Sequence, residues 1–229
     1  MIILVTGATA GFGESITRRF VANGHKVIAT GRRQERLQEL KDELGDSILT
    51  AQLDVRNRAA IEEMIANLPA EWRAIDVLVN NAGLALGMEP AHKASVEDWE
   101  NMIDTNNKGL VYMTRAVLPG MVERNRGHII NIGSTAGSWP YAGGNVYGAT
   151  KAFVLFLSQG LSLELGPQGV YVQAVVPSAT RTEIWERSGK DVNTMTGVMD
   201  PGELVDAALI GFERREAVTI PPLHEESLW

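Results

Sequence analysis

Tyr147 and Lys151 are the residues whose types and spacing point most directly to chemistry. They stand four positions apart and would share one face of a helix. A free phenol has a pKa of about 10 and is a weak base at neutral pH. A neighbouring ammonium group favours the phenolate and lowers that pKa toward a useful range. The pair therefore predicts Tyr147 as an acid/base group, and an amphipathic surface pair is the alternative.

Two further polar residues extend this predicted set. Ser134 ends an apolar segment, and its hydroxyl could polarise a substrate oxygen beside the tyrosine. Asn106 falls in the middle of a predicted helix, where asparagine is unfavourable. A use for its amide, such as holding a water bonded to Lys151, would explain that position. A turn serine and a polar surface patch are the alternatives, but the order of the four residues favours catalysis.

A glycine-rich turn follows the first apolar run of the chain. Gly7 allows a tight turn, Gly11 leaves room for a pyrophosphate beside the backbone, and Gly13 lets the next helix pack closely. The N-terminus of that helix would offer free N–H groups to phosphate. An ordinary turn between a strand and a helix is the alternative. The residues expected to contact a dinucleotide here are Gly7, Thr9, Gly11, Phe12 and Gly13.

Two adjacent arginines indicate which dinucleotide binds. An NAD site normally has an acidic residue at the end of the second strand, where it accepts from the ribose 2′-hydroxyl. This chain has Arg32 and Arg33 there instead. Guanidinium groups suit a 2′-phosphate in charge and geometry. The sequence therefore predicts NADP, and two solvated surface arginines are the alternative.

The ends of the third and fourth strands supply the remaining predicted cofactor contacts. Asp54 could accept from the adenine amino group beside the Val55 backbone, or it could cap the helix that starts near Asn57. The small and amide residues after the fourth strand would let the backbone pass close to a ribose, although a plain turn would look similar. These residues are Asn81, Ala82 and Gly83.

The elements that must position these residues alternate along the chain. Short apolar runs predict strands at Ile2–Thr6, His25–Thr30, Ile48–Val55, Ile75–Asn80, His128–Gly133, Val170–Val176 and Val218–Ile220. Amphipathic stretches predict helices at Gly13–Asn23, Arg33–Leu44, Ala59–Asn67, Ser95–Glu123, Asn145–Leu165 and Pro201–Arg215. The alternation predicts an α/β fold: a doubly wound, Rossmann-type domain with a seven-stranded parallel sheet flanked by helices. Ligands of such sheets bind at the carboxyl ends of the strands.

Composition limits the class of protein. The chain has 229 residues, a length typical of one α/β domain, and we expect a single domain over residues 1–229. A net charge of −7 argues against a nucleic-acid partner. The chain contains no cysteine, so disulfides and thiolate metal sites are excluded, and we expect no metal. With no apolar stretch long enough for a membrane span or a leader, we expect a cytoplasmic protein.

These motifs together resemble the short-chain dehydrogenase/reductase family across nearly the whole chain. The matching segments are Thr6–Gly13, Asp54-Val55, Asn80–Gly83, Asn106–Gly109, Ser134 and Tyr147–Lys151. The resemblance implies that Tyr147 is the acid/base and that Lys151 activates it and binds the nicotinamide ribose. It implies that Ser134 orients the substrate oxygen and that Asn106 holds a proton-relay water. It also implies a homotetramer formed through the helices near 95–123 and 145–165.

The first two thirds of the chain are similar to a narrower group, the bacterial NADP-dependent 3-hydroxy acid dehydrogenases. That group acts on serine and allo-threonine and reduces malonic semialdehyde, so we expect hydride transfer at the hydroxyl-bearing carbon of such a substrate or of 3-hydroxypropionate. The segments that carry this likeness are Thr6–Gly13, Gly31–Arg36, Gly87–Ala91 and Gly137–Tyr141. A reductase of another alcohol or carbonyl class and a non-catalytic NADP-binding scaffold are the alternatives.

Beyond Phe153 the likeness changes. Pro177 is followed by serine rather than the glycine expected in the family, and residues 198–222 resemble another short-chain branch. This change, with the chain's last residue at Trp229, is typical of a recombined, engineered or shortened sequence. Pro177 and Thr182 are still expected at the cofactor. Arg181 is a candidate partner for the substrate carboxylate, with solvation and pairing to Glu183 as the alternative.

Overall fold

The apolar runs form one parallel sheet in the computed structural model of the chain, which describes residues 1–87, 89–140, 144–182, 192–194 and 197–222. Within these ranges the sheet has seven strands in the order β3-β2-β1-β4-β5-β6-β7. The strands are β1 (Ile2–Thr6), β2 (Lys26–Gly31), β3 (Ile48–Gln52), β4 (Val77–Asn80), β5 (Gly127–Ile132), β6 (Val170–Val175) and β7 (Val218–Thr219). The predicted fold class is confirmed, because every neighbouring pair is parallel.

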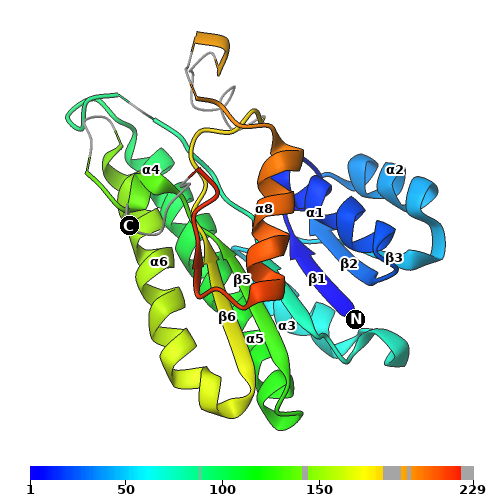
Figure 1. The fold of residues 1–229 in the computed structure, drawn as a ribbon. Coiled ribbons are helices and arrows are strands. Elements are labelled where there is room, and N and C mark those ends of the chain that lie inside the picture. The colour runs from blue at the N-terminus through cyan, green and yellow to red at the C-terminus, as the bar shows by residue number, and fades with distance from the viewer. Residues whose placement is uncertain (88, 141–143, 183–191, 195–196, 223–229) are drawn as a thin grey trace.

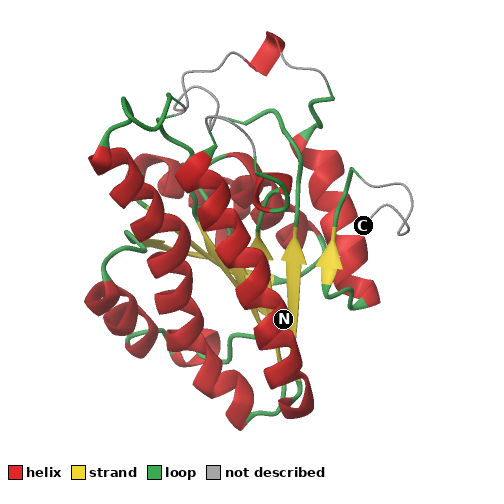
Figure 2. Ribbon diagram, turned by 90° about the vertical axis from the view of Figure 1, so that its left-hand side faces the viewer, coloured by secondary structure: helices red, strands yellow, loops and turns green. Residues whose placement is uncertain are grey.

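Helices cover both faces of this sheet (Figures 1 and 2). They are α1 (Gly11–Ala22), α2 (Gln34–Leu44), α3 (Arg58–Ala66), α4 (Val96–Ile103), α5 (Leu110–Glu123), α6 (Asn145–Leu165) and α8 (Pro201–Arg214). Side chains of β1 alternate between the two faces. Ile3 and Val5 pack against α1, α2 and α8, whereas Leu4 packs against α3, α5 and α6. Both sides of the strand are therefore buried, as its unbroken apolar sequence requires.

The predicted helix Ser95–Glu123 is wrong in one respect. It is interrupted by a π-helical segment, Asp104–Gly109, that separates α4 from α5. Asn106 lies in this segment and directs its amide to main-chain groups of residue 84. Gly109 lies against the exit of β3, since a Cβ atom there would be 2.6 Å from the Val55 side chain. The irregular turn thus lies beside the carboxyl edge of the sheet, where π segments often accompany function.

The third strand also ends earlier than predicted, at Gln52 rather than Val55. After Leu53 donates to the Gly31 carbonyl, the chain turns through Asp54 toward α3. In the stretch from Ser178 to Asp200, residues 183–191 and 195–196 lie outside the described residues. Its described parts include a 3-10 turn at Val192–Thr194 and a bridge between Thr180 and Met199. No helix in the described ranges is both long and apolar enough to cross a membrane.

Gly13 provides a test of how tightly α1 packs on the sheet. A Cβ atom at this position would lie 2.8 Å from the Gly7 carbonyl carbon. We predict that Gly13→Ala lowers the free energy of unfolding by about 1–3 kcal/mol, because the backbone must move to admit the methyl group. Urea titration followed by circular dichroism measures this change.

Gly160 gives the matched control, since it lies in α6 and a Cβ atom there would have no neighbour within 4 Å among the described residues. Gly160→Ala should leave stability unchanged or raise it by roughly 0.5–1 kcal/mol, because alanine favours the helix. Equal effects of the two substitutions would contradict the close packing inferred for Gly13.

Candidate active site

A cavity of about 720 Å³ opens at the carboxyl edge of the sheet. Its size is that of a pocket for a cofactor or drug-sized ligand. It gathers most of the predicted site residues from distant parts of the chain. Those on its wall are Gly7, Thr9, Gly11, Phe12, Arg32, Arg33, Asp54, Val55, Asn81, Ala82, Gly83, Ser134, Tyr147, Lys151, Pro177 and Thr182. Gly13, Asn106 and Arg181 do not line it.

The glycine turn forms the middle of the cavity wall. Gly7 and Gly11 have positive φ angles of 66° and 54°, a conformation that glycine adopts without strain. Ala10 precedes α1 and provides no side-chain cap, so the first N–H groups of this helix have no side-chain acceptor at that position. Thr182 lies over the turn, 3.1 Å from where a Gly11 Cβ would be. An anionic group fits at this helix end.

The end of β4 is fastened to the glycine turn by side-chain hydrogen bonds. The Asn81 amide donates to the carbonyl oxygens of Thr6 and Gly7, at 2.9 and 3.1 Å. The Thr6 hydroxyl in turn accepts from the main-chain N–H groups of Asn81 and Ala82, both at 3.0 Å. Asn81 therefore acts as more than a turn residue, because it sets the distance between two walls of the cavity.

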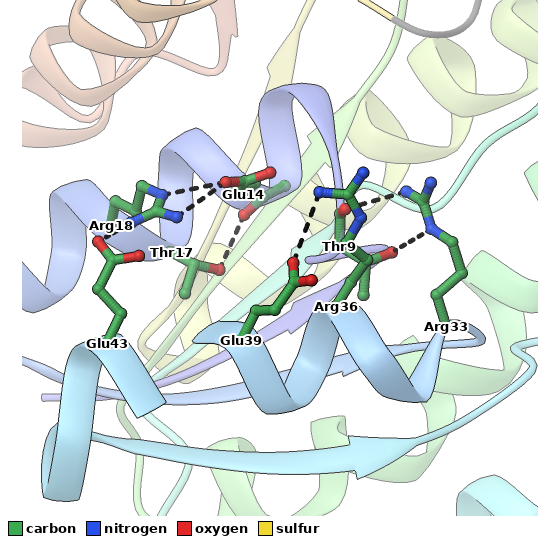
Figure 3. A network of polar contacts seen from close by, with 9 residues as sticks. Thr9, Glu14, Thr17, Arg18, Arg33, Arg36, Glu39 and Glu43 are labelled. Atoms are coloured by element: carbon green, nitrogen blue, oxygen red, sulfur yellow. Dashed lines mark hydrogen bonds and ion pairs between the residues drawn. The ribbon is translucent and has the colours of Figure 1, made fainter. Parts of the chain in front are cut away.

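Arg32 and Arg33 lie at one end of the cavity but have different surroundings. Arg33 donates from Nη2 to the Thr9 carbonyl at 2.9 Å and from Nε to the Thr9 hydroxyl at 3.3 Å (Figure 3). Arg32 is exposed, and its main-chain carbonyl accepts from Gln52. Nearby, Arg36 pairs with Glu39 (Figure 3). Arg36 does not line the cavity.

Asp54 lines the cavity and is held by Arg56. The guanidinium of Arg56 binds both carboxylate oxygens, and the contact to Oδ2 is 2.6 Å long. This hydrogen-bonded charge lowers the pKa of Asp54 below its ordinary value. The alternative that Asp54 caps the next helix is wrong. Asn57 caps α3 instead, because its side chain accepts from the Ala60 N–H at 3.1 Å.

Tyr147 and Lys151 occupy the opposite end, on the first turns of α6. The Lys151 Nζ lies 5.9 Å from the centre of the Tyr147 ring and donates to the Ile132 carbonyl at 2.9 Å. Burial lowers the pKa of Lys151 to about 8, because the interior disfavours its charged form. Tyr147 lies in the first turn of the helix, where the positive end of the helix dipole favours a phenolate.

Ser134 reaches the same wall through close packing of its turn. Its hydroxyl accepts from the Ala136 N–H at 3.1 Å and caps the short turn Thr135–Gly137. A Cβ atom at Gly137 would lie 2.6 Å from the Ala152 nitrogen, so this turn rests directly on α6. Ser134, Tyr147 and Lys151 are thereby placed on one cavity wall, as the sequence predicted.

Asn106 lies behind that wall and contacts it indirectly. Its Nδ2 donates to the Leu84 carbonyl and to the Thr150 hydroxyl, at 2.9 and 3.0 Å. Its Oδ1 accepts from the Leu84 N–H at 2.7 Å. Thr150 in turn donates to the Tyr147 carbonyl at 2.7 Å. These bonds explain why an asparagine is buried inside a helix, whereas the predicted relay water stays a prediction.

Thr150 is a site residue that the sequence reasoning missed. It is buried and connects Asn106 to the turn that carries Tyr147. Its position three residues after the tyrosine was the available indication, since a helical threonine commonly bonds a carbonyl one turn earlier. Other wall residues outside the predicted set include Leu84, Ala85, Thr105 and Ala179, whereas Trp139 and Pro140 belong to the segment Gly137–Tyr141 that carries the narrower likeness.

Arg181 is not brought to the cavity. Its guanidinium is exposed and donates to the Asn193 side chain at 2.8 Å, and its N–H donates to the Met199 carbonyl at 3.0 Å. Glu183, its alternative partner, lies outside the described residues, as do Met88 and Tyr141 of the segments used for the narrower likeness. The geometry therefore gives the proposed carboxylate contact of Arg181 no support.

Comparisons with known proteins agree with this geometry. The model of the short chain dehydrogenase family matches residues 1–193. The chain is 81% identical over 177 residues to the NADP-dependent 3-hydroxy acid dehydrogenase YdfG of Escherichia coli K12, a match that covers 77% of this chain and 71% of the relative.

Two solved structures are similar over almost the full length. A closed form of serine dehydrogenase in complex with NADP+ has a TM-score of 0.92 and 65% identity, with 96% of this chain and 94% of that chain covered. A short-chain dehydrogenase from Sphingobium yanoikuyae in complex with NADPH has a TM-score of 0.92 and 46% identity. That match covers 100% of this chain and 90% of the other.

The buried ammonium of Lys151 predicts a dependence of stability on pH. The pKa of Lys151 is about 8 in the folded chain, below the ordinary value of 10.5, so its charge destabilises the fold at neutral pH. Between pH 8 and pH 10.5 the folded protein has lost this proton, whereas the unfolded chain still carries it. The stability of the fold therefore rises with pH until the unfolded chain also loses its proton near pH 10.5. Relative to Lys151→Met, the wild type should therefore gain up to about 1.4 kcal/mol per pH unit above pH 8.

Urea unfolding of both proteins at pH 7, 8, 9 and 10 measures this gain. Lys93→Met, at an exposed lysine, controls for the loss of one positive charge and should follow the wild type. If the difference between wild type and Lys151→Met is the same at pH 7 and pH 10, the buried ammonium carries no such cost.

Proposed function

The chain belongs to the short-chain dehydrogenase family, and we propose that it moves a hydride between NADP and the hydroxyl-bearing carbon of a small 3-hydroxy acid. The activity as an NADP-dependent oxidoreductase follows from the family and from relatives whose names and structures contain NADP. One observation supports this most strongly. A single cavity holds two arginines at one end, a glycine turn in the middle, and Ser134, Tyr147 and Lys151 at the other end.

The cavity wall fits an extended dinucleotide. We assign the adenosine end to Asp54, Val55 and the paired arginines, and the pyrophosphate to the uncapped start of α1 beside Gly11. We assign the nicotinamide end to Lys151 and to Thr182, which lies over the turn. Bound NADP would supply the acceptor or donor of the hydride. The protein must then supply orientation and a path for one proton.

Tyr147 is proposed to carry that proton. In oxidation its phenolate would take the proton of the substrate hydroxyl, and in reduction its phenol would return one to the carbonyl oxygen. The Lys151 ammonium and the helix dipole both favour the phenolate. Ser134 would donate to the same substrate oxygen. Asn106 does not line the cavity; it would hold the first turn of α6 through Thr150 and would bind a relay water near Lys151.

A 3-hydroxy acid is the proposed substrate class, and serine, allo-threonine and 3-hydroxypropionate with its semialdehyde are the candidates. The relative at 81% identity supports this class by its name. A second candidate, a neutral alcohol or ketone, is favoured by the described wall at the substrate end. Apart from Lys151, that wall consists of apolar and hydroxyl side chains, and Arg181 does not line it but donates to Asn193. A scaffold without turnover would not need Tyr147 and Lys151 together.

We also propose a homotetramer. Along α6 the side chains of Phe156 and Leu163 are 81% and 83% exposed, and Phe153 is 42% exposed. Val96 on α4 and Val111 on α5 are exposed as well. Apolar side chains this exposed on neighbouring helices support burial against another copy. A cytoplasmic location stays a prediction of the sequence.

The first prediction from this proposal concerns the proton carrier. Tyr147→Phe keeps the ring but removes the hydroxyl, so turnover should fall by about 10²- to 10⁴-fold. The affinity for NADPH, followed by its fluorescence, should change little. Tyr112→Phe is the matched control, because Tyr112 lies on α5 and does not line the cavity. Near-full activity of Tyr147→Phe would exclude the proposed role.

The second prediction concerns the substrate. With NADP, kcat/KM for serine should exceed that for ethanolamine by about tenfold or more, because ethanolamine lacks the carboxylate. The same difference should separate 3-hydroxypropionate from ethanol. Initial rates of absorbance change at 340 nm measure this preference. A preference for the uncharged alcohols would remove the hydroxy-acid class and retain the general oxidoreductase. Arg181→Ala should leave KM for the acids unchanged, since its guanidinium contacts Asn193 instead.

A further inference from the structure

Asn107 follows Asn106 in the π-helical segment and makes a contact of its own with α6. Its Nδ2 donates to the main-chain carbonyl oxygen of Thr150 at 3.0 Å. Asn106 donates to the hydroxyl of the same threonine, also at 3.0 Å. Two consecutive side chains reach one residue here because Thr150 presents one acceptor on its side chain and another on its backbone. The segment Asp104–Gly109 therefore holds Thr150 in two ways.

The bond from Asn107 acts on the peptide that joins Thr150 to Lys151. That peptide carries the Thr150 carbonyl and the Lys151 N–H, which point in opposite directions because the bond is trans. In the α-helical pattern the Lys151 N–H points back to the carbonyl of Tyr147, four residues earlier. By holding the carbonyl of this peptide, Asn107 fixes the main-chain atoms from which the Lys151 side chain starts.

The far end of the Lys151 side chain is held as well. Its Nζ donates to the Ile132 carbonyl at 2.9 Å, and the residue is buried. The Thr150 hydroxyl donates to the Tyr147 carbonyl at 2.7 Å, which adds a side-chain bond to the turn between the tyrosine and the lysine. Asn107 itself is partly buried and does not line the cavity. Its place therefore suits an action on the tyrosine–lysine pair through Thr150 rather than a contact with a ligand.

We propose that Asn107 is a positioning residue for the acid/base pair, which keeps the Lys151 ammonium 5.9 Å from the centre of the Tyr147 ring. This inference rests on the proposed function, because it takes Tyr147 as the proton carrier. A lysine held at both ends keeps its charge in one place beside the phenol. A misplacement of about 1 Å at such a site costs up to about 10²-fold in rate. The opposing view is that Asn107 only fastens the π-helical segment to α6.

Titration of the Tyr147 ring separates these views without requiring turnover. The chain has four tyrosines, so labelling tyrosine with carbon-13 at Cζ gives few NMR signals, and Tyr147→Phe identifies the one from residue 147. Asn107→Leu keeps the size of the side chain and removes the donor, whereas Asn107→Ala removes the donor without any added bulk. Both should move the titration midpoint of Tyr147 upward by about one pH unit in the cofactor-free protein, because the ammonium is held less firmly beside the phenol.

Turnover and cofactor binding provide a second comparison. In both Asn107 variants kcat should fall about tenfold at neutral pH, because the pair is no longer held in its productive arrangement. The affinity for NADPH, followed by fluorescence, should change by less than about twofold, since Asn107 does not line the cavity. A split of this kind distinguishes a positioning role from a general loss of folded protein.

Ser158 provides the matched control, because it takes part in a similar chain of hydrogen bonds further along α6. Asn131 donates to the Ser158 hydroxyl at 2.9 Å, and that hydroxyl donates to the Val154 carbonyl at 2.6 Å. Ser158 is buried and does not line the cavity. Ser158→Ala should lower the urea midpoint, as the Asn107 variants do, but should leave both kcat and the titration of Tyr147 unchanged.

Two outcomes distinguish failure of this proposal from failure of the proposed function. If the Asn107 variants lose stability while Tyr147 titrates as in the wild type, Asn107 is only a fastening between helices and the proposal is overturned. If the titration moves as expected but the wild type transfers no hydride to or from any tested acid or alcohol, the positioning of Lys151 stands and the proposed function is overturned.

Discussion

The buried ammonium of Lys151 is the constraint on which the active end of the molecule depends. A charged lysine in the interior lowers the stability of the fold, and the hydrogen bond that Lys151 donates to the carbonyl of Ile132 at the end of β5 offsets only part of this cost. The neighbouring structure holds it in place: the turn after Ser134 rests on α6 through Gly137, and Asn106 holds Thr150. A group that is costly to bury is retained where it can stabilise the phenolate of the adjacent tyrosine.

At the cofactor end of the cavity, close contacts between backbone segments hold the glycine turn in place. Gly13 leaves α1 in contact with the Gly7 carbonyl group, and Gly31 leaves β2 in contact with Thr9. Asn81 then links β4 to the turn through two main-chain carbonyls. These contacts lie beside a helix end whose N–H groups have no side-chain cap, where we propose that the pyrophosphate binds. Side chains that follow β2 and β4 hold the turn through hydrogen bonds to the carbonyl oxygens of Thr6, Gly7 and Thr9.

The sequence was informative where a local pattern has a single structural consequence. The apolar runs predicted the strands, because a parallel strand covered on both faces needs apolar residues throughout. The sequence was not informative where contacts with other residues determine the role of a side chain. It is compatible with Asp54 as a helix cap and as a cofactor contact, and the cap is excluded by the positions of Arg56 and Asn57. Asn106 was recognised as misplaced in a helix, but its partners Leu84 and Thr150 belong to other elements.

By itself the sequence determined the fold class, the order of the elements, the tyrosine–lysine spacing and the preference for a phosphorylated cofactor, because each follows from residue type and short-range periodicity. The tertiary structure decided which of those residues share a cavity. It placed Gly13 and Asn106 behind the wall, turned Arg181 toward Asn193, and gave Arg32 and Arg33 different surroundings. Such distinctions depend on side-chain directions set by contacts between remote segments, which neither composition nor spacing along the chain encodes.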